Sequence, residues 1–206
     1  AEISIAVDVL FPNWLMFEVL ERFGRESPQT RIEWYETVIE GTIEALVTGK
    51  VDLAITNTIP PGYGGEQIFE IKGIPVAHPD HELHKLGRPV EMRDLRKHRH
   101  VVVRDTGTKR DKKVRTLEST QRWTVSNMST SIGAVSRGFG FAWLPQYKVF
   151  PELTSGELKE LQLSEPRELV GQLYLVFADR EGAGPGRATP GPPFVLSKTS
   201  KKLFRR

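Results

Sequence analysis

The first 56 residues alternate between two hydrophobic periods, and this alternation restricts the fold more than any other feature of the chain. Ile3–Val7 places apolar residues at every second position, as a strand does, and an apolar stripe at helical spacing follows Pro12. The same order recurs, with a strand expected over 31–36, a helix over 42–47 and a strand over 51–55. Strand–helix–strand–helix–strand with short links predicts two right-handed parallel crossover units.

The remainder of the chain repeats this alternation in a second run of elements. A long extended segment is expected over 67–76, and a strong late strand over 169–178. Between these two segments the pattern predicts a polar surface loop and then alternating helices and strands, over 78–89, 92–95, 100–103, 109–117, 120–125, 128–137 and 140–144.

The two runs together predict an α/β protein of two lobes joined by two crossing strands. We expect one lobe to comprise residues 1–66 with 179–206, and the other to comprise 67–178. Within the first lobe's tail, residues 182–193 have the Gly- and Pro-rich composition of a linker, and 194–206 is expected to form a short terminal helix.

Composition excludes several classes of protein. The 206 residues include no cysteine, so disulfides, thiolate metal sites and cysteine nucleophiles are excluded. No apolar stretch reaches the ~20 residues that span a bilayer, and we expect a cytoplasmic protein with no membrane partner. The formal net charge is +3, but six basic residues and no acidic one follow Glu181, so the body is slightly acidic. The basic excess therefore does not indicate a DNA-reading face.

The usual signatures of catalysis are missing, and we assign no catalytic residue, no metal and no cofactor. Gly49-Lys50 is followed by Val51, so it does not complete a phosphate-binding loop. His78, His81 and His84 recur at every third position, which would allow a zinc site with Asp80 or Glu82. A solvated polar loop explains the same spacing and is the favoured interpretation.

Better candidates lie where the predicted strands end, because ligands of open parallel α/β sheets bind at the carboxyl edges beside helix N-termini. The unpaired N–H groups there suit a carboxylate, so a small carboxylate-bearing metabolite is favoured, with Trp14 or Phe141 close by. Helix capping is the alternative explanation for each polar residue taken alone. The candidate ligand-binding residues are Asp8, Val9, Leu10, Thr37, Val38, Ile39, Thr56, Asn57, Asp105, Asn127, Met128 and Ser129.

Seven short segments also share the order and spacing of a known family. They are Phe17–Phe23 with Ser27-Pro28, Gly49–Ile55, Asp80–Leu83, Met92–Leu95, Val135–Pro145, Gly156–Leu158 and Leu173–Val176. Together they resemble the effector-binding domain of LysR-type transcriptional regulators, over residues 2 to 180. The resemblance implies a type-2 periplasmic-binding-protein-like fold whose effector loops map onto the candidate residues above.

The resemblance also implies a function for the domain. Family members bind an inducer between two lobes and assemble through this domain, often as antiparallel dimers, so we expect a homo-oligomer, dimer or tetramer. The family's N-terminal winged helix-turn-helix is not among these residues. We therefore expect the chain to reach DNA only through such a domain.

Two other classes of protein remain as alternatives. One is an extracytoplasmic solute-binding receptor of a transport system, which shares the fold. The other is an enzyme on the same scaffold, for which Asp8 or Asp105 would be the acid or base.

Overall fold

The structure is a computed structural model that describes residues 2–104, 106–107, 119, 121–165 and 169–178. The described residues form two compact units. One holds the residues up to Glu70, Thr106 with Gly107, and those from Gln172; the other holds those from Ile71 to Arg104 and from Ser119 to Gly171. The predictions over 109–117, 182–193 and 194–206 lie outside the described residues.

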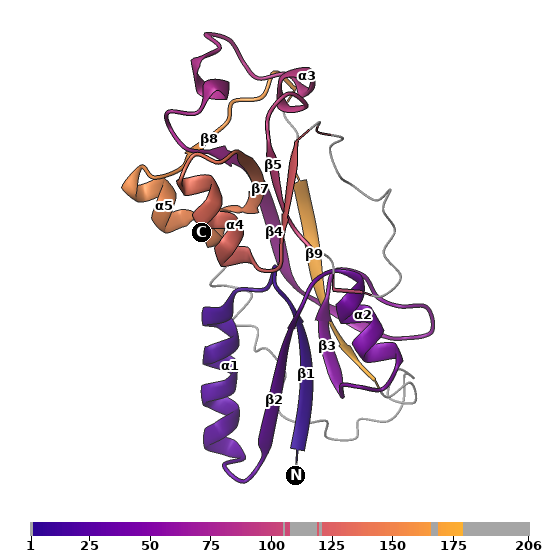
Figure 1. Cartoon of the computed structure of the whole chain (residues 1–206). Helices are drawn as coiled ribbons and strands as arrows, with labels where there is room; N and C mark the ends of the chain where they lie inside the picture. Colours follow the sequence, from indigo (N-terminus) through magenta and orange to yellow (C-terminus); the bar gives the residue numbers. More distant parts are fainter. Residues whose placement is uncertain (1, 105, 108–118, 120, 166–168, 179–206) are drawn as a thin grey trace. The chain divides into compact units, whose positions relative to one another are not determined.

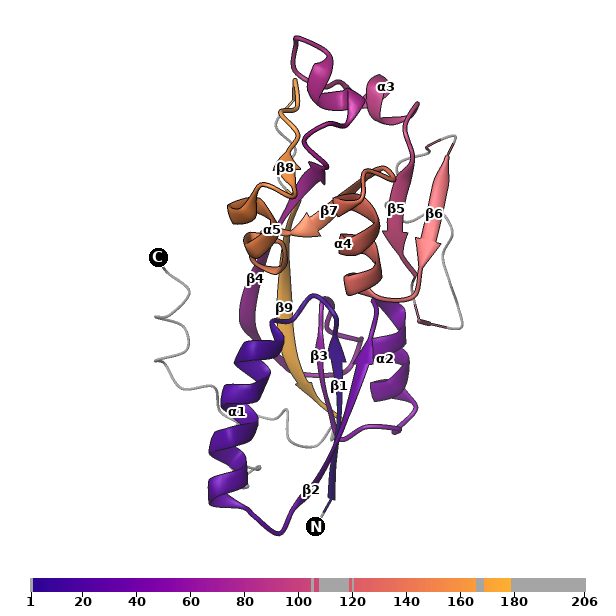
Figure 2. The same cartoon turned by 60° about the vertical axis from the view of Figure 1, so that its left-hand side comes forward.

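The first unit is the predicted strand–helix–strand–helix–strand. Its elements are β1 (Glu2–Asp8), α1 (Asn13–Glu26), β2 (Arg31–Thr37), α2 (Glu40–Val47), β3 (Leu53–Thr56) and the larger part of β9 (Leu169–Phe177). β1 pairs in parallel with β2 on one side and with β3 on the other, and β3 pairs antiparallel with β9. The crossover from β1 to β2 and the crossover from β2 to β3 run in opposite directions along the sheet, so α1 and α2 cover its opposite faces (Figures 1 and 2).

The alternation along β1 explains how both faces are buried. Ala6 points to the α2 face, where small side chains let the helix approach and Leu46 fills the space. Ile5 and Val7 are also buried and lie on the opposite face because side chains alternate along a strand. On the α1 helix, Leu15, Met16 and Phe23 are buried.

The second unit also combines strands and helices, but its sheet is mixed, with parallel and antiparallel pairs. Its elements are β4 (Gly65–Ala77, from Ile71 on), η1 (Glu82–Lys85), α3 (Met92–Leu95), β5 (His100–Val103), β6 (Arg122–Val125), α4 (Met128–Ser136), β7 (Phe141–Pro145), η2 (Gln146–Lys148), α5 (Phe150–Ser155) and β8 (Lys159–Glu160). The strands lie in the order β4-β7-β5-β6, with β8 on the other edge of β4. β5 is parallel to β6 and β7, whereas β7 and β8 are antiparallel to β4.

Two crossing strands are confirmed, since both β4 and β9 continue from one unit into the other. β4 changes unit after Glu70, and β9 changes after Gly171. The predicted lobe limits, 1–66 with 179–206 and 67–178, stay a prediction. The described residues add one detail to them, because Thr106 and Gly107 pack with the first unit.

The surface loop predicted over 78–89 is confirmed for most of its residues, which are exposed or half-buried. The exception is Leu83, which is fully buried in a core cluster with Leu95 and Phe141. The short helix η1 begins here, and His81 Nδ1 accepts the Leu83 N–H at 3.2 Å. A single apolar residue in a polar run carries no periodicity, so hydrophobic patterning did not reveal its burial.

No helix in the described part of the chain is both long enough and apolar enough to cross a membrane.

Candidate functional site

The candidate residues of the first unit meet at the carboxyl ends of β1 and β2. The two strands are parallel and in register, with Asp8 opposite Thr37, so they end side by side. Asp8 is 0% exposed. Its Oδ1 accepts the N–H of Leu10 at 2.9 Å, and its Oδ2 accepts the N–H of Ile39 at 3.0 Å. One buried carboxylate thus joins the loop after β1 to the loop after β2.

Ile39 has an unusual backbone at this junction. Its φ of 48° lies in the left-handed region, which β-branched residues rarely adopt. It is the residue that precedes α2, and its side chain is exposed. The hydrogen bond to Asp8 helps to hold this conformation, because strained backbone persists only where the surroundings fix it.

The segment Thr106–Gly107 closes over the start of α2. Val38 N–H donates to Thr106 Oγ1 at 2.8 Å, and the Thr106 hydroxyl donates back to the Val38 carbonyl at 3.2 Å. The approach is close enough that a Cβ on Gly41 would lie 1.9 Å from Thr106 Oγ1. A Cβ on Gly107 would likewise lie 2.6 Å from the Cβ of Glu40. Glycine is therefore required on both sides of this contact.

The hydroxyl groups beneath this contact pair with one another. Thr37 Oγ1 and Thr42 Oγ1 are 2.7 Å apart, and Thr42 is fully buried. The sequence interpretation missed Thr42 and both glycines, and it assigned Thr106, at the end of a predicted strand, to the second lobe. No local pattern shows these residues as neighbours, because they meet only when the segment after β5 returns to the first unit.

The end of β3 carries two further candidate residues, Thr56 and Asn57. Thr56 is fully buried, and its hydroxyl accepts a weak hydrogen bond from Thr58 N–H at 3.5 Å. Asn57 Oδ1 is buried and accepts no hydrogen bond from any described residue. A buried acceptor without a partner is uncommon and costs free energy, so Asn57 is the most prominent unsatisfied group at this edge.

The candidates of the second unit cap a helix. Asn127 Oδ1 accepts the N–H of Thr130 at 2.7 Å, as an N-cap residue of α4 does. Met128 packs partly against the core, and Ser129 is exposed. Capping, the alternative considered for these residues, therefore applies to Asn127. Asp105 lies outside the described residues.

The two aromatic candidates differ in exposure. Trp14 is 45% exposed on α1. Phe141 is fully buried in the second unit, where its ring stacks on that of His100 at 4.9 Å between centroids. Phe141 is therefore a core residue.

Burial controls the charge of the histidines in the second unit. Burial lowers the pKa of His100 from 6.5 to about 4, and the neighbouring positive charge of Arg122 acts in the same direction. Burial also lowers the pKa of His81 to about 4, with a further contribution from His98, whose ring lies 5.1 Å away. Both side chains are thus neutral near pH 7. Among the described residues, no three His, Asp or Glu side chains converge as a metal site would require.

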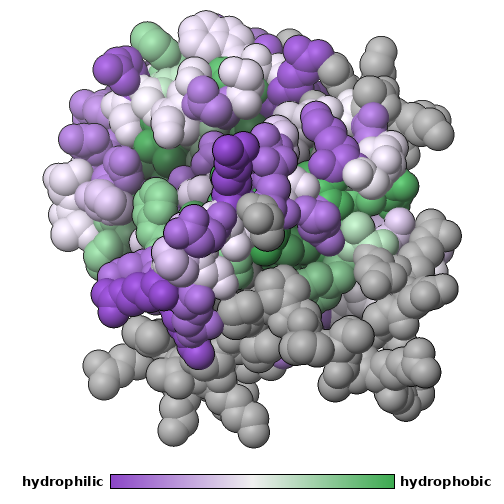
Figure 3. Space-filling model, turned by 90° about the horizontal axis from the view of Figure 1, so that it is seen from below, coloured by the Kyte–Doolittle hydropathy of each residue, from purple (hydrophilic) through white to green (hydrophobic). Residues whose placement is uncertain are grey.

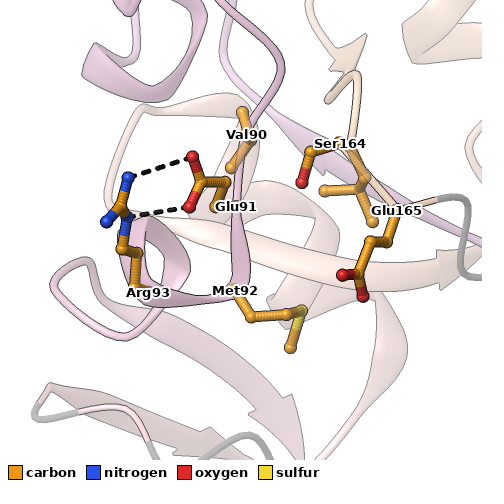
Figure 4. Close-up of a pocket in the computed structure, with 7 residues that line it drawn as sticks. Val90, Glu91, Met92, Arg93, Ser164 and Glu165 are labelled. Atoms are coloured by element: carbon orange, nitrogen blue, oxygen red, sulfur yellow. Dashed lines mark hydrogen bonds and ion pairs between the residues drawn. The ribbon is translucent and has the colours of Figure 1, made fainter.

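A cavity of about 510 Å³ also lies in the second unit, beside α3 (Figure 4). Glu91 and Arg93 on its wall pair with each other, with contacts of 2.8 and 3.1 Å. Its lining residues are Val90, Glu91, Met92, Arg93, Leu163, Ser164 and Glu165. None of the predicted ligand-binding residues is among them.

Two α/β units linked by two shared strands define the type-2 periplasmic-binding-protein-like class of fold. A family model described as "LysR substrate binding domain" matches residues 1–186. The chain belongs to this family.

The relatives agree with that assignment. The chain is 27% identical over 164 residues to the uncharacterized HTH-type transcriptional regulator YeeY of Escherichia coli K12, covering 77% of this chain and 53% of the relative. It is 25% identical over 170 residues to the HTH-type transcriptional regulator PunR of the same organism, covering 80% and 55%. The chain thus spans about half the length of the curated relatives it matches.

Solved structures show the same fold. The regulatory domain of MetR from Neisseria meningitidis superposes with a TM-score of 0.64 at 20% identity, over 85% of this chain and 83% of that chain. Full-length AphB of Vibrio cholerae gives 0.66 at 18% identity, over 89% and 64%. The chain is therefore the effector-binding domain of a LysR-type transcriptional regulator, and the transport-receptor alternative is not supported.

Proposed function

We propose that this domain binds a small-molecule effector at the carboxyl ends of β1, β2 and β3, and that binding is its output rather than catalysis. The observation that supports this proposal is the unsatisfied Asn57 acceptor beside the interlocked loops of Asp8 and Ile39. The candidate acid or base of an enzyme, Asp8, is buried and holds two backbone N–H groups, which suits a structural role.

The wider setting is part of the same proposal. Effector binding changes the conformation of a bacterial, cytoplasmic regulator. That regulator contacts DNA through the helix-turn-helix domain that the family carries. Coupling of this kind is typically worth ~1–3 kcal/mol between two sites. We also propose Asn127, Met128 and Ser129 of the second unit as residues that contact an effector.

The effector site can be tested by a thermal-shift screen of the purified chain against small organic acids, amides, amines and aromatics. A compound present at 100 times its Kd is expected to stabilise the fold by about 2.7 kcal/mol, which raises Tm by several degrees. Asn57→Ala and Ser129→Ala are expected to remove that shift. Gln29→Ala, at an exposed position between α1 and β2, is the control and should keep it. A compound that shifts wild type and Asn57→Ala equally would place binding elsewhere.

We further propose that two copies associate side by side, each first unit against the second unit of its partner. In the described part of the sheet β2 and β6 are edge strands, and both lie beside exposed aromatic side chains. Phe17 is 59% exposed and its ring packs on that of Trp34 at 5.7 Å. Trp123 and Phe139, both over 40% exposed, lie 5.5 Å apart in the second unit. Exposed apolar areas among hydrophilic side chains are visible on the face in Figure 3.

The charges of the two units favour this pairing. Acidic residues outnumber basic ones in the described first unit, with Glu2, Asp8, Glu18, Glu21, Glu26, Glu33, Glu36, Glu40, Glu44, Asp52, Glu66 and Glu70 against Arg22, Arg25, Arg31 and Lys50. The described second unit has the opposite excess, with Lys72, Lys85, Arg88, Arg93, Arg96, Lys97, Arg99, Arg104, Arg122, Arg137, Lys148 and Lys159 against Asp80, Glu82, Glu91, Asp94, Glu152, Glu157, Glu160 and Glu165. Opposite fields steer unlike units together and oppose the pairing of like units.

Sedimentation analysis tests this arrangement. Phe17→Glu and Trp123→Glu, each alone, are expected to give monomers, because each places a charge in an apolar contact. Phe150→Glu is the control, since Phe150 is 64% exposed but lies on α5, away from either edge strand in sequence. Wild-type association is also expected to weaken as salt rises. Association that survives both edge substitutions would show that the contact lies on another surface.

A further inference from the structure

The chemical class of the effector follows from the hydrogen-bond donors and acceptors at the carboxyl edge of the first unit, if the proposed site is correct. An anionic effector needs free backbone N–H groups at this edge. The N–H groups of Leu10 and Ile39 instead donate to the two carboxylate oxygens of Asp8, at 2.9 and 3.0 Å. These two N–H groups therefore already donate to a carboxylate of the protein itself.

The donors around the start of α2 are also used internally. Val38 N–H donates to Thr106 Oγ1 at 2.8 Å. The N–H groups of Gly41 and Thr42 donate to the carbonyls of Val38 and Ile39, both at 3.1 Å. Four N–H groups at this helix end, those of Val38, Ile39, Gly41 and Thr42, are therefore used in contacts of the chain with itself.

The unsatisfied buried group at this edge is a hydrogen-bond acceptor. Asn57 Oδ1, at the end of β3, is buried without a donor among the described residues. A ligand N–H or O–H would satisfy it, whereas a ligand carboxylate would bring a further acceptor and a negative charge near the buried Asp8. We propose that the effector of this protein is uncharged or cationic at this edge and donates a hydrogen bond to Asn57, while Asp8 takes the position of an effector carboxylate.

The first arm of the test compares matched compounds on the wild-type chain. Each compound that raises Tm in the screen is measured against its analogue in the other class, such as benzamide against benzoate or acetamide against acetate. The amide is expected to bind at least tenfold more tightly than the carboxylate, and Asn57→Ala is expected to remove that preference. A carboxylate that binds wild type as tightly as its amide overturns the proposal.

The second arm tests whether Asp8 fills an anion position, and it needs no knowledge of the effector. Asp8→Ala frees the N–H groups of Leu10 and Ile39, so acetate or formate is expected to raise the Tm of this variant by several degrees. Acetamide is expected not to do so, and acetate should leave wild type unchanged relative to sodium chloride at equal ionic strength. Asp8→Ser replaces Asp8→Ala if the larger cavity prevents folding.

The two arms separate two kinds of failure. If acetate does not stabilise the Asp8 variants, the carboxylate position does not exist and the inference is wrong. If acetate does stabilise them but no screened compound shifts wild type through Asn57, the proposed effector site fails and the account of Asp8 stands.

Discussion

Gly41→Ala is expected to lower the free energy of unfolding by about 2–3 kcal/mol, although alanine is a better helix former than glycine. The added Cβ would lie 1.9 Å from Thr106 Oγ1 and 2.9 Å from the Thr106 carbonyl carbon. A backbone atom cannot rotate away, so Thr106 and Gly107 must leave the start of α2. The hydrogen bonds between Val38 and Thr106 are then lost. Urea denaturation measures the difference.

Gly24→Ala is the matched control. Gly24 lies inside α1, and a Cβ there meets no atom within 4 Å. This substitution is expected to stabilise the protein by roughly 0.5–1 kcal/mol, because it only removes the conformational freedom of glycine. If Gly41→Ala stabilised the protein to the same extent, the contact between Thr106 and α2 would not exist in solution.

Acidification is expected to destabilise the second unit between pH 6.5 and 4. The pKa of His100 in the folded protein is about 4, against 6.5 as its ordinary value, so the unfolded chain takes up a proton first. The stability that the neutral His100 gives to the folded protein is fully present above pH 6.5, and it is lost as pH falls from 6.5 to 4. For the buried His100 it amounts to at most about 3 kcal/mol. His81, which has the same pKa but is partly exposed, adds less because solvent screens it.

Variants identify the groups that are responsible. His100→Leu keeps an apolar side chain against Phe141 and is expected to flatten the fall in stability, measured by urea denaturation at several pH values. His81→Asn is expected to flatten it to a smaller extent. The pKa of Asp94 is lowered to about 2 by its hydrogen bond with Arg88, so its contribution is lost only as pH falls from 3.8 toward 2. A steep fall above pH 5 in the His100→Leu, His81→Asn double variant would assign the effect to other groups.

Several elements could be predicted from sequence because their patterns are local. The helix over Met92–Leu95 and the strand over His100–Val103 have the predicted limits, and the three parallel strands of the first unit follow from their alternation. The helix α5 was not predicted. It has only six residues and no buried one, so it lacks the apolar stripe on which a helix prediction depends.

The contacts within the candidate site could not be predicted from local patterns either. Asp8 and Ile39 were selected because each follows a predicted strand, and parallel strands end at one edge. The sequence could not show that the Asp8 carboxylate accepts the Ile39 N–H, since 31 residues separate them. The two hydrogen bonds give Asp8 a structural role as the link between two loops, and its contact with a ligand stays a prediction.

The amino-acid sequence alone determined the fold class, the two crossing strands and the family of this protein, because periodicity and the order of short motifs are written along the chain. The tertiary structure alone decided which donors and acceptors remain at the carboxyl edge. Which donors and acceptors remain depends on hydrogen bonds between residues distant in sequence, such as Val38 and Thr106. Folding brings these groups together, and the N–H groups of Leu10, Val38 and Ile39 then donate within the chain.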